Sequence, residues 1–184
     1  MDVIKIFAIP GSIRKSSSNH LLLTAISELA GDNMKISIFQ SLETIPPFNP
    51  DHDGDEVPQE VDDFRNQIKD ADGIIICTPE YAHGVPGALK NAIDWTVSNA
   101  SFSHKPTMLI TASTDVRYGH AALLETLKVI EAAAIIELQL VIPFIQTKVN
   151  KDAKITDEKT VNELESLLYK LAAAVRKKEN MAPL

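Results

Sequence analysis

A short polar segment near the start of the chain combines residue types that bind phosphate. Residues 11–19 read GSIRKSSSN, and apolar residues at helical spacing begin directly after them. A helix start presents unpaired N–H groups and a partial positive charge, and serine hydroxyls and the Arg14 guanidinium add further donors. The segment therefore predicts a phosphate site. The alternative is a helix cap rich in serine and asparagine, which needs only one such residue.

The same segment differs from two common nucleotide-binding loops. It lacks the second glycine and the Gly-Lys-Ser/Thr ending of a Walker A loop, and it does not contain the G-x-G-x-x-G dinucleotide pattern. A nucleoside triphosphate would need a longer cradle and a magnesium partner. We therefore expect a single terminal phosphate.

A second segment, TPEYAHGVPG at residues 78–87, is suited to a planar ligand. Its two prolines and two glycines fix an unusual backbone that can offer N–H and C=O groups to a heterocycle, and Tyr81 adds an aromatic face. Alternatives remain for each side chain. Tyr81 is also consistent with a packing residue and His83 with a solvated or structural one, and Glu80 is suited to orienting backbone amides without touching a ligand.

A third segment, STDVRYGH at residues 113–120, can close the other side of the same cleft, or it is an ordinary turn in which His120 caps the following helix. Ser113, Asp115 and His120 are close in sequence, but nothing in the pattern indicates the geometry of a catalytic triad. We therefore predict no catalytic side chain.

The elements that must position these segments alternate between strand and helix. Strand patterns cover residues 3–9, 35–39, 73–78, 106–112 and 135–141, and helical spacing covers 21–29, 61–71, 86–97, 123–130 and 161–175. This alternation implies right-handed crossovers and a parallel sheet covered on both faces. Ligands of such sheets bind at the carboxyl ends of the strands, where all three segments fall. Residues 46–56, rich in proline and acids, are expected to form a solvated loop.

Composition limits the class of protein. The 184 residues predict one domain over residues 1–178, with a frayed tail at 179–184. A net charge of −7 argues against nucleic-acid and anionic-lipid partners. The single cysteine, Cys77, excludes an internal disulfide and leaves too few thiolates for a cysteine-based metal site. No apolar run approaches the ~18 residues of a membrane span, and the first residues lack a signal-peptide pattern, so we expect a cytoplasmic protein.

Two motifs together resemble the NAD(P)H-dependent FMN reductase family, which includes quinone, azo-dye and chromate reductases. The first is G-S-x-R-x-x-S-x-N at residues 11–19, and the second joins TPEY at 78–81 to VPGALKNAIDW at 85–95. The similarity extends from the first to the fifth predicted strand and includes PPFN at 46–49. It implies an α/β flavodoxin-like three-layer sandwich with a five-stranded parallel sheet in the order 2-1-3-4-5.

The resemblance also implies non-covalently bound FMN and NAD(P)H as cofactors. The matching cofactor-binding positions are Ser12, Arg14, Ser17, Ser18, Asn19, Pro79, Glu80, Tyr81, Ala82, His83, Gly84 and Ser113, with no metal. The sequence departs from the family at two places. Ala82 stands where many members have asparagine, which bears on side-chain contact with the flavin. Residues 115–118 replace a glycine-rich loop, which bears on the width of the substrate slot or on nicotinamide preference.

The implied activity is electron transfer from NAD(P)H through FMN to a small acceptor such as a quinone, azo compound, chromate or free flavin. Donor and acceptor use the slot in turn, a ping-pong mechanism. Backbone amides of the second and third segments, with Arg117 or His120 as weaker candidates, are expected to stabilise charge on the reduced ring. A flavodoxin-type electron carrier and a flavin-binding regulatory protein are the alternatives, and Arg14 with the long second motif favours the reductase. The family implies a homodimer or homotetramer, and Trp95 and Phe102 fit either its interface or the core.

Overall fold

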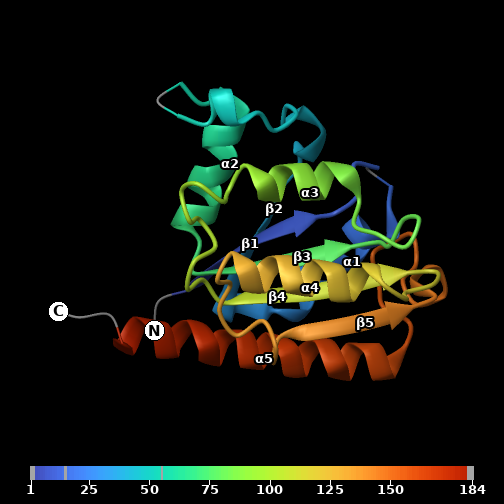
Figure 1. Cartoon of the computed structure of the whole chain (residues 1–184). Coiled ribbons are helices and arrows are strands. Elements are labelled where there is room, and N and C mark those ends of the chain that lie inside the picture. The colour runs from blue at the N-terminus through green and yellow to red at the C-terminus, as the bar shows by residue number, and fades with distance from the viewer. Residues whose placement is uncertain (1–2, 15, 55, 182–184) are drawn as a thin grey trace.

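The computed structural model describes residues 3–14, 16–54 and 56–181, which form one parallel sheet between two layers of helices (Figure 1). The strands are β1 (Ile4–Pro10), β2 (Met34–Ile38), β3 (Gly73–Thr78), β4 (Thr107–Ser113) and β5 (Gln139–Pro143). Their order is β2-β1-β3-β4-β5, and every neighbouring pair is parallel. This confirms the flavodoxin-like fold predicted from the sequence.

Five helices cover the two faces of the sheet. They are α1 (Ser18–Leu29), α2 (Gln59–Asp70), α3 (Gly87–Asp94), α4 (Gly119–Val129) and α5 (Glu158–Met181). Apolar residues of α1 and α5 share one core with the sheet, and those of α2, α3 and α4 share a second core on the other face. In Figure 1, α5 runs along one side of the sheet and α2, α3 and α4 lie on the opposite side.

Strand β3 lies at the centre of this arrangement, and all of its residues are buried. Side chains of a strand point alternately to the two faces, so the unbroken run Ile74, Ile75 and Ile76 contributes to both cores. Burying each of these side chains contributes about 1.5–3 kcal/mol. This central position is what the uninterrupted apolar pattern indicates.

Some element boundaries differ from the predicted ones. Helix α3 ends at Asp94 instead of 97, and the turns that follow bury Trp95 and Phe102 to 1% and 0% exposure, so both are core residues. Strand β5 begins at Gln139 instead of 135, because a turn at Ala134, whose φ is +57°, precedes it. Helix α5 continues beyond 175 to Met181. The predicted frayed tail includes residues 182–184, which lie outside the described residues, and it stays a prediction.

Most described residues of the segment at 46–56 are exposed, as expected for a solvated loop, but the Asp53 side chain is an exception. Asp53 forms an ion pair of 2.6 Å with Arg65 of α2, and the two side chains are only 8% and 10% exposed. Ser98 donates a further hydrogen bond to the Asp53 carboxylate at 3.0 Å. Burial alone would raise the pKa of Asp53, but hydrogen bonds from Arg65 and Ser98 hold it below its usual value. The acids of this segment therefore include a buried tether that composition does not reveal.

Two negative findings apply to the described part of the chain. None of its helices combines the length and apolar character needed to cross a bilayer. In residues 3–14, 16–54 and 56–181, no group of three or more His, Cys, Asp or Glu side chains is arranged to hold a metal ion.

Candidate functional site

The three polar segments meet at the carboxyl edge of the sheet, as predicted. We call residues 11–17, which follow β1, the first loop; residues 79–86, which follow β3, the second loop; and residues 114–118, which follow β4, the third loop. The N–H of Gly11 donates to the carbonyl of Cys77 at 2.7 Å. A Cβ at Gly11 would lie 2.2 Å from Thr78 Oγ1, so only glycine lets the first loop pass this close to the end of β3.

The first loop presents hydroxyl groups at the start of α1. Ser17 caps the helix, with its Oγ accepting from the N–H of His20 at 3.2 Å. The Oγ of Ser12 likewise accepts from the N–H of Arg14 at 3.3 Å. A hydroxyl that accepts in this way keeps its own hydrogen for donation, and the Arg14 side chain is exposed beside it. These groups fit a phosphate monoester.

A small cleft lies beside the first loop. It has a volume of about 200 Å³ and continues to residues that follow β2. Its polar and charged lining comes from Ser12, Arg14, His20, Gln40 and Glu43. His20 and Gln40 were not among the predicted site residues, although their places at the start of α1 and just after β2 put both at the carboxyl edge.

Asn19 has a structural role in its side chain. Its Nδ2 donates to the carbonyl of Ala112 at 3.0 Å, and its Oδ1 accepts from Cys77 Sγ at 3.2 Å. The side chain therefore ties α1 to β3 and β4, so the phosphate contact predicted for Asn19 would have to use its backbone N–H. Burial raises the pKa of the Cys77 thiol, which stays protonated.

The second loop contains a tight turn with an unusual backbone. Tyr81 and Gly84 exchange N–H···O=C hydrogen bonds of 3.1 and 2.9 Å across it. The two residues between them, Ala82 and His83, have φ of +48° and +61°. This left-handed conformation costs roughly 1–2 kcal/mol per L-residue. The Tyr81 side chain is 50% exposed, so it is not a core packing residue.

Glu80 joins the second loop to the third. Its carboxylate accepts the N–H groups of Arg117, Tyr118 and Gly119 at 2.9, 3.2 and 2.9 Å. Burial alone would raise the pKa of Glu80, but these three backbone hydrogen bonds hold it below its usual value. The interpretation that Glu80 orients backbone amides is therefore confirmed. The same amides are engaged by Glu80, which corrects the expectation that this part of the third loop stabilises a reduced ring.

A close approach of backbones supports this junction. A Cβ at Gly119 would lie 2.9 Å from Glu80 Cγ and 3.0 Å from the carbonyl oxygen of Gly84. The hydroxyl of Ser113 donates to the carbonyl of Glu80 at 3.4 Å. Gly119 was not a predicted site residue. A glycine directly after the third loop was the available signal, but its partner in the second loop is set only by the fold.

His120 and Arg117 have partners other than those considered from the sequence. The His120 ring lies between Thr111 Oγ1 and Gln139 Oε1, at 2.8 and 2.9 Å, so it links β4 to β5 and does not cap α4. The start of α4 is instead capped by Glu80. The Arg117 guanidinium pairs with the Asp115 carboxylate at 2.6 Å, and both side chains are exposed. The expectation that Arg117 or His120 assists a reduced ring stays a prediction.

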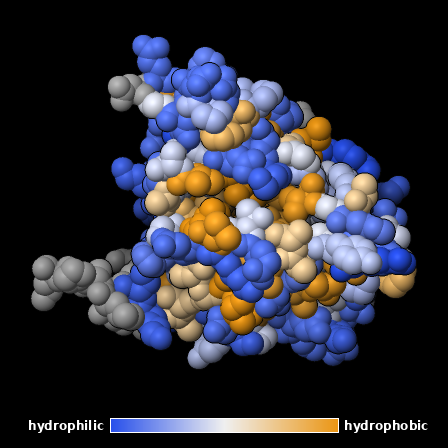
Figure 2. All heavy atoms as spheres, viewed as in Figure 1, coloured by the Kyte–Doolittle hydropathy of each residue, from blue (hydrophilic) through white to orange (hydrophobic). Residues whose placement is uncertain are grey.

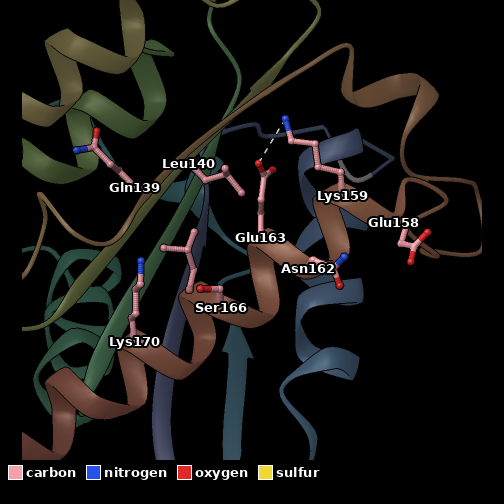
Figure 3. Close-up of a pocket in the computed structure, with 9 residues that line it drawn as sticks. Gln139, Leu140, Glu158, Lys159, Asn162, Glu163, Ser166 and Lys170 are labelled. Carbon is pink, nitrogen blue, oxygen red and sulfur yellow. Dashed lines mark ion pairs between the residues drawn. The ribbon is translucent and has the colours of Figure 1, made fainter.

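A separate hollow lies between β5 and α5 (Figure 3). It has a volume of about 730 Å³ and is lined by Gln139 and Leu140 of β5 and by polar residues of α5. Its Lys159 and Glu163 side chains pair with each other at 3.7 Å along the helix. We assign no chemistry to this hollow.

A comparison with protein families identifies the family to which this chain is similar. A sequence profile described as NADPH-dependent FMN reductase matches residues 4–147, which include all three loops. This chain belongs to the NADPH-dependent FMN reductase family. The prediction of FMN and NAD(P)H as cofactors is confirmed at the level of this family.

Relatives of this FMN reductase family member are named for quinone and flavin chemistry. It is 32% identical over 180 residues to a 2-hydroxy-1,4-benzoquinone reductase of Burkholderia sp, covering 94% of this chain and 97% of that protein. It is 34% identical over 116 residues to a quinone reductase of Escherichia coli K12, a match that spans 61% of this chain and 62% of the relative. A solved structure, the flavoenzyme NAD(P)H:(acceptor) oxidoreductase FerB of Paracoccus denitrificans, matches with a TM-score of 0.78 and 26% identity over 95% of this chain and 98% of FerB.

Proposed function

We propose that this protein transfers electrons from NAD(P)H through bound FMN to a small acceptor such as a quinone, an azo compound, chromate or free flavin. The observation that carries the proposal is that the first-loop hydroxyls and the second-loop turn follow the paired strands β1 and β3 at one edge of the sheet, where Gly11 hydrogen-bonds to the end of β3. A phosphate site next to a backbone suited to a planar ring matches the two ends of FMN. The names of the relatives support the same reaction class.

Each loop has a distinct part in the proposed site. The Ser12 and Ser17 hydroxyls and the Arg14 guanidinium would donate to the phosphate at the N-terminus of α1. The backbone of the second loop and the exposed ring of Tyr81 would border the flavin. Bound FMN would supply two-electron transfer, so no protein nucleophile is required. Glu80 fixes the third loop against the second before any ligand arrives.

The nicotinamide donor and the acceptor would use the same slot in turn. The second and third loops are joined by Glu80 on one side, which leaves their exposed rims to receive both substrates. We therefore infer a ping-pong mechanism. Initial rates at several fixed quinone concentrations should give parallel double-reciprocal plots against NAD(P)H, whereas intersecting lines would contradict the shared slot.

The proposal is tested by FMN binding. Arg14→Ala removes a charge-assisted contact with the phosphate and should weaken FMN affinity about ten- to a hundredfold. Quenching of flavin fluorescence gives the dissociation constant. The matched control is Arg176→Ala on α5, an exposed arginine away from the three loops. Equal dissociation constants for both variants and the unchanged protein would remove Arg14 from the phosphate site.

A second measurement separates the reductase from an electron carrier and from a regulatory flavoprotein. The FMN-loaded protein should be reduced directly and rapidly by NADH or NADPH in stopped-flow absorbance, and it should then turn over a quinone. A carrier would need a partner reductase for the first step. Slow turnover with quinone, azo, chromate and free-flavin acceptors alike would favour the regulator.

We also propose that the protein is a homodimer or homotetramer, with a second copy on the face between α3 and α4. Figure 2 shows apolar residues near the centre of the face turned to the viewer. A groove of about 550 Å³ separates the two helices there, lined by Val97, Ala100, Ala122, Val129 and Ile130. Its charged lining consists of Lys90, Asp94, Glu125 and Glu131, of which Lys90 and Asp94 pair with each other. Light scattering during size-exclusion chromatography measures the molar mass and so the number of copies. A cytoplasmic location stays a prediction.

A further inference from the structure

We propose that Tyr118 and His83 form an aromatic wall that selects planar aromatic acceptors over compact ones in the proposed active site. This inference rests on the proposed function. It concerns the third loop, where the sequence departs from the glycine-rich pattern of its family. The bulky residue Tyr118 there reaches a side chain of the second loop, the loop that we expect to border the flavin.

The two rings contact each other across the loops. The His83 and Tyr118 ring centroids are 4.9 Å apart and their planes are inclined by 56°. Tyr118 is nevertheless 59% exposed. The aromatic pairs of the core, such as Phe7 with Phe64, are instead buried. Much of the Tyr118 ring is therefore available to a ligand while His83 supports it.

The wall is held in place by both loops. The N–H of Tyr118 donates to the Glu80 carboxylate, and Gly119 packs closely against Glu80. His83 keeps a left-handed backbone with φ of +61° inside the Tyr81–Gly84 turn. A non-glycine residue stays in this conformation only where its surroundings maintain it. A surface whose backbone is held in this way loses little further backbone entropy when a flat ligand binds.

The chemistry of the wall distinguishes two classes of acceptor. A planar ring gains from offset or edge-to-face contact with another ring, which corresponds to about two- to tenfold in affinity. A compact, non-aromatic acceptor such as ferricyanide has no ring to place against it. The exposed ring of Tyr81 adds a further aromatic surface in the second loop. Selectivity, measured as a ratio of kcat/KM values, should therefore depend on Tyr118.

The test compares 1,4-naphthoquinone with ferricyanide at saturating FMN and NAD(P)H. Tyr118→Ala should lower the ratio of the quinone kcat/KM to the ferricyanide kcat/KM by about two- to tenfold, through the quinone KM. Tyr118→Phe keeps the ring and should restore the ratio. Tyr169→Ala, which removes an exposed tyrosine of α5, is the matched control. His83→Asn removes the supporting ring with a residue that tolerates a left-handed backbone, and should lower the ratio in the same direction.

Several outcomes would overturn the wall. An unchanged ratio in Tyr118→Ala would do so, as would an equal loss for both acceptors or a failure of Tyr118→Phe to restore selectivity. If Tyr118→Ala does not fold, an unchanged ratio in His83→Asn decides against the proposal. Failure of the proposed function looks different, because the unchanged protein would then bind no FMN or oxidise no NAD(P)H with either acceptor, and the wall would fall with it.

Discussion

Replacement of Glu80 by glutamine tests how the second and third loops are joined. The carboxylate accepts three backbone N–H groups at the start of α4 and carries a negative charge that favours this helix end. Glutamine keeps one acceptor oxygen, offers an unwanted donor and loses the charge. Loss of a helix cap typically costs about 0.5–2 kcal/mol. With three donors affected, we expect Glu80→Gln to lower the free energy of unfolding by about 1–2 kcal/mol.

The pH dependence gives this prediction a sign. The folded-state pKa of Glu80 is held below the ordinary value, so its contribution to stability is present above the unfolded-state pKa of about 4.3. That contribution is lost as the pH falls through the lower folded-state pKa. The difference in stability between the unchanged protein and Glu80→Gln should therefore be full at pH 7 and should shrink below about pH 4.

Urea unfolding at a series of pH values measures the effect, and thermal unfolding should show a loss of about 2–8 °C near neutral pH. Glu125→Gln is the matched control, since Glu125 forms an exposed ion pair with Lys128 on α4. Such surface pairs contribute little to stability. Hydrogen exchange of the amides at 117–119 adds a local readout, because these N–H groups should lose protection. Equal stabilities of the two variants across the pH series would refute this account of Glu80.

Two further substitutions probe the scaffold. Ala82→Gly removes the cost of a left-handed alanine in the second loop and should raise the free energy of unfolding in urea by about 0.5–1 kcal/mol. As the control, Ala121→Gly in α4 should lower it by about 1 kcal/mol. A loss of stability in Ala82→Gly would contradict the turn geometry. Lys105 is only 7% exposed, and its ammonium donates to the carbonyls of Ile68, Lys69 and Ala71. The substitution Lys105→Met removes this ammonium. Lys105→Met should lower the free energy of unfolding by about 2–4 kcal/mol. The FMN affinity should be unchanged, because Lys105 precedes β4 at the opposite edge of the sheet. A loss of stability below about 0.5 kcal/mol would show that these carbonyls do not need the ammonium.

Much of the fold could be predicted because its determinants are local. A strand with both faces covered needs apolar side chains in succession, so the run at Ile74–76 by itself marks the centre of the sheet. The alternation of strands and helices fixes parallel crossovers. Those crossovers send the polar segments to one edge. The serines and Arg14 after β1 then indicate an anion site by residue type alone.

The tertiary structure alone decided which groups meet. Glu80 lies 37 to 39 residues from the amides that it accepts, and Asn19 lies 93 residues from the carbonyl to which it donates. A residue's type states that it needs a partner but not which strand will bring that partner within 3 Å. The left-handed backbone at Ala82 and His83 is equally invisible in the sequence, since neither residue is the glycine that this conformation favours. Only packing between loops that are distant in sequence holds such a conformation, so the polar contacts of this site follow from how the strands are brought side by side.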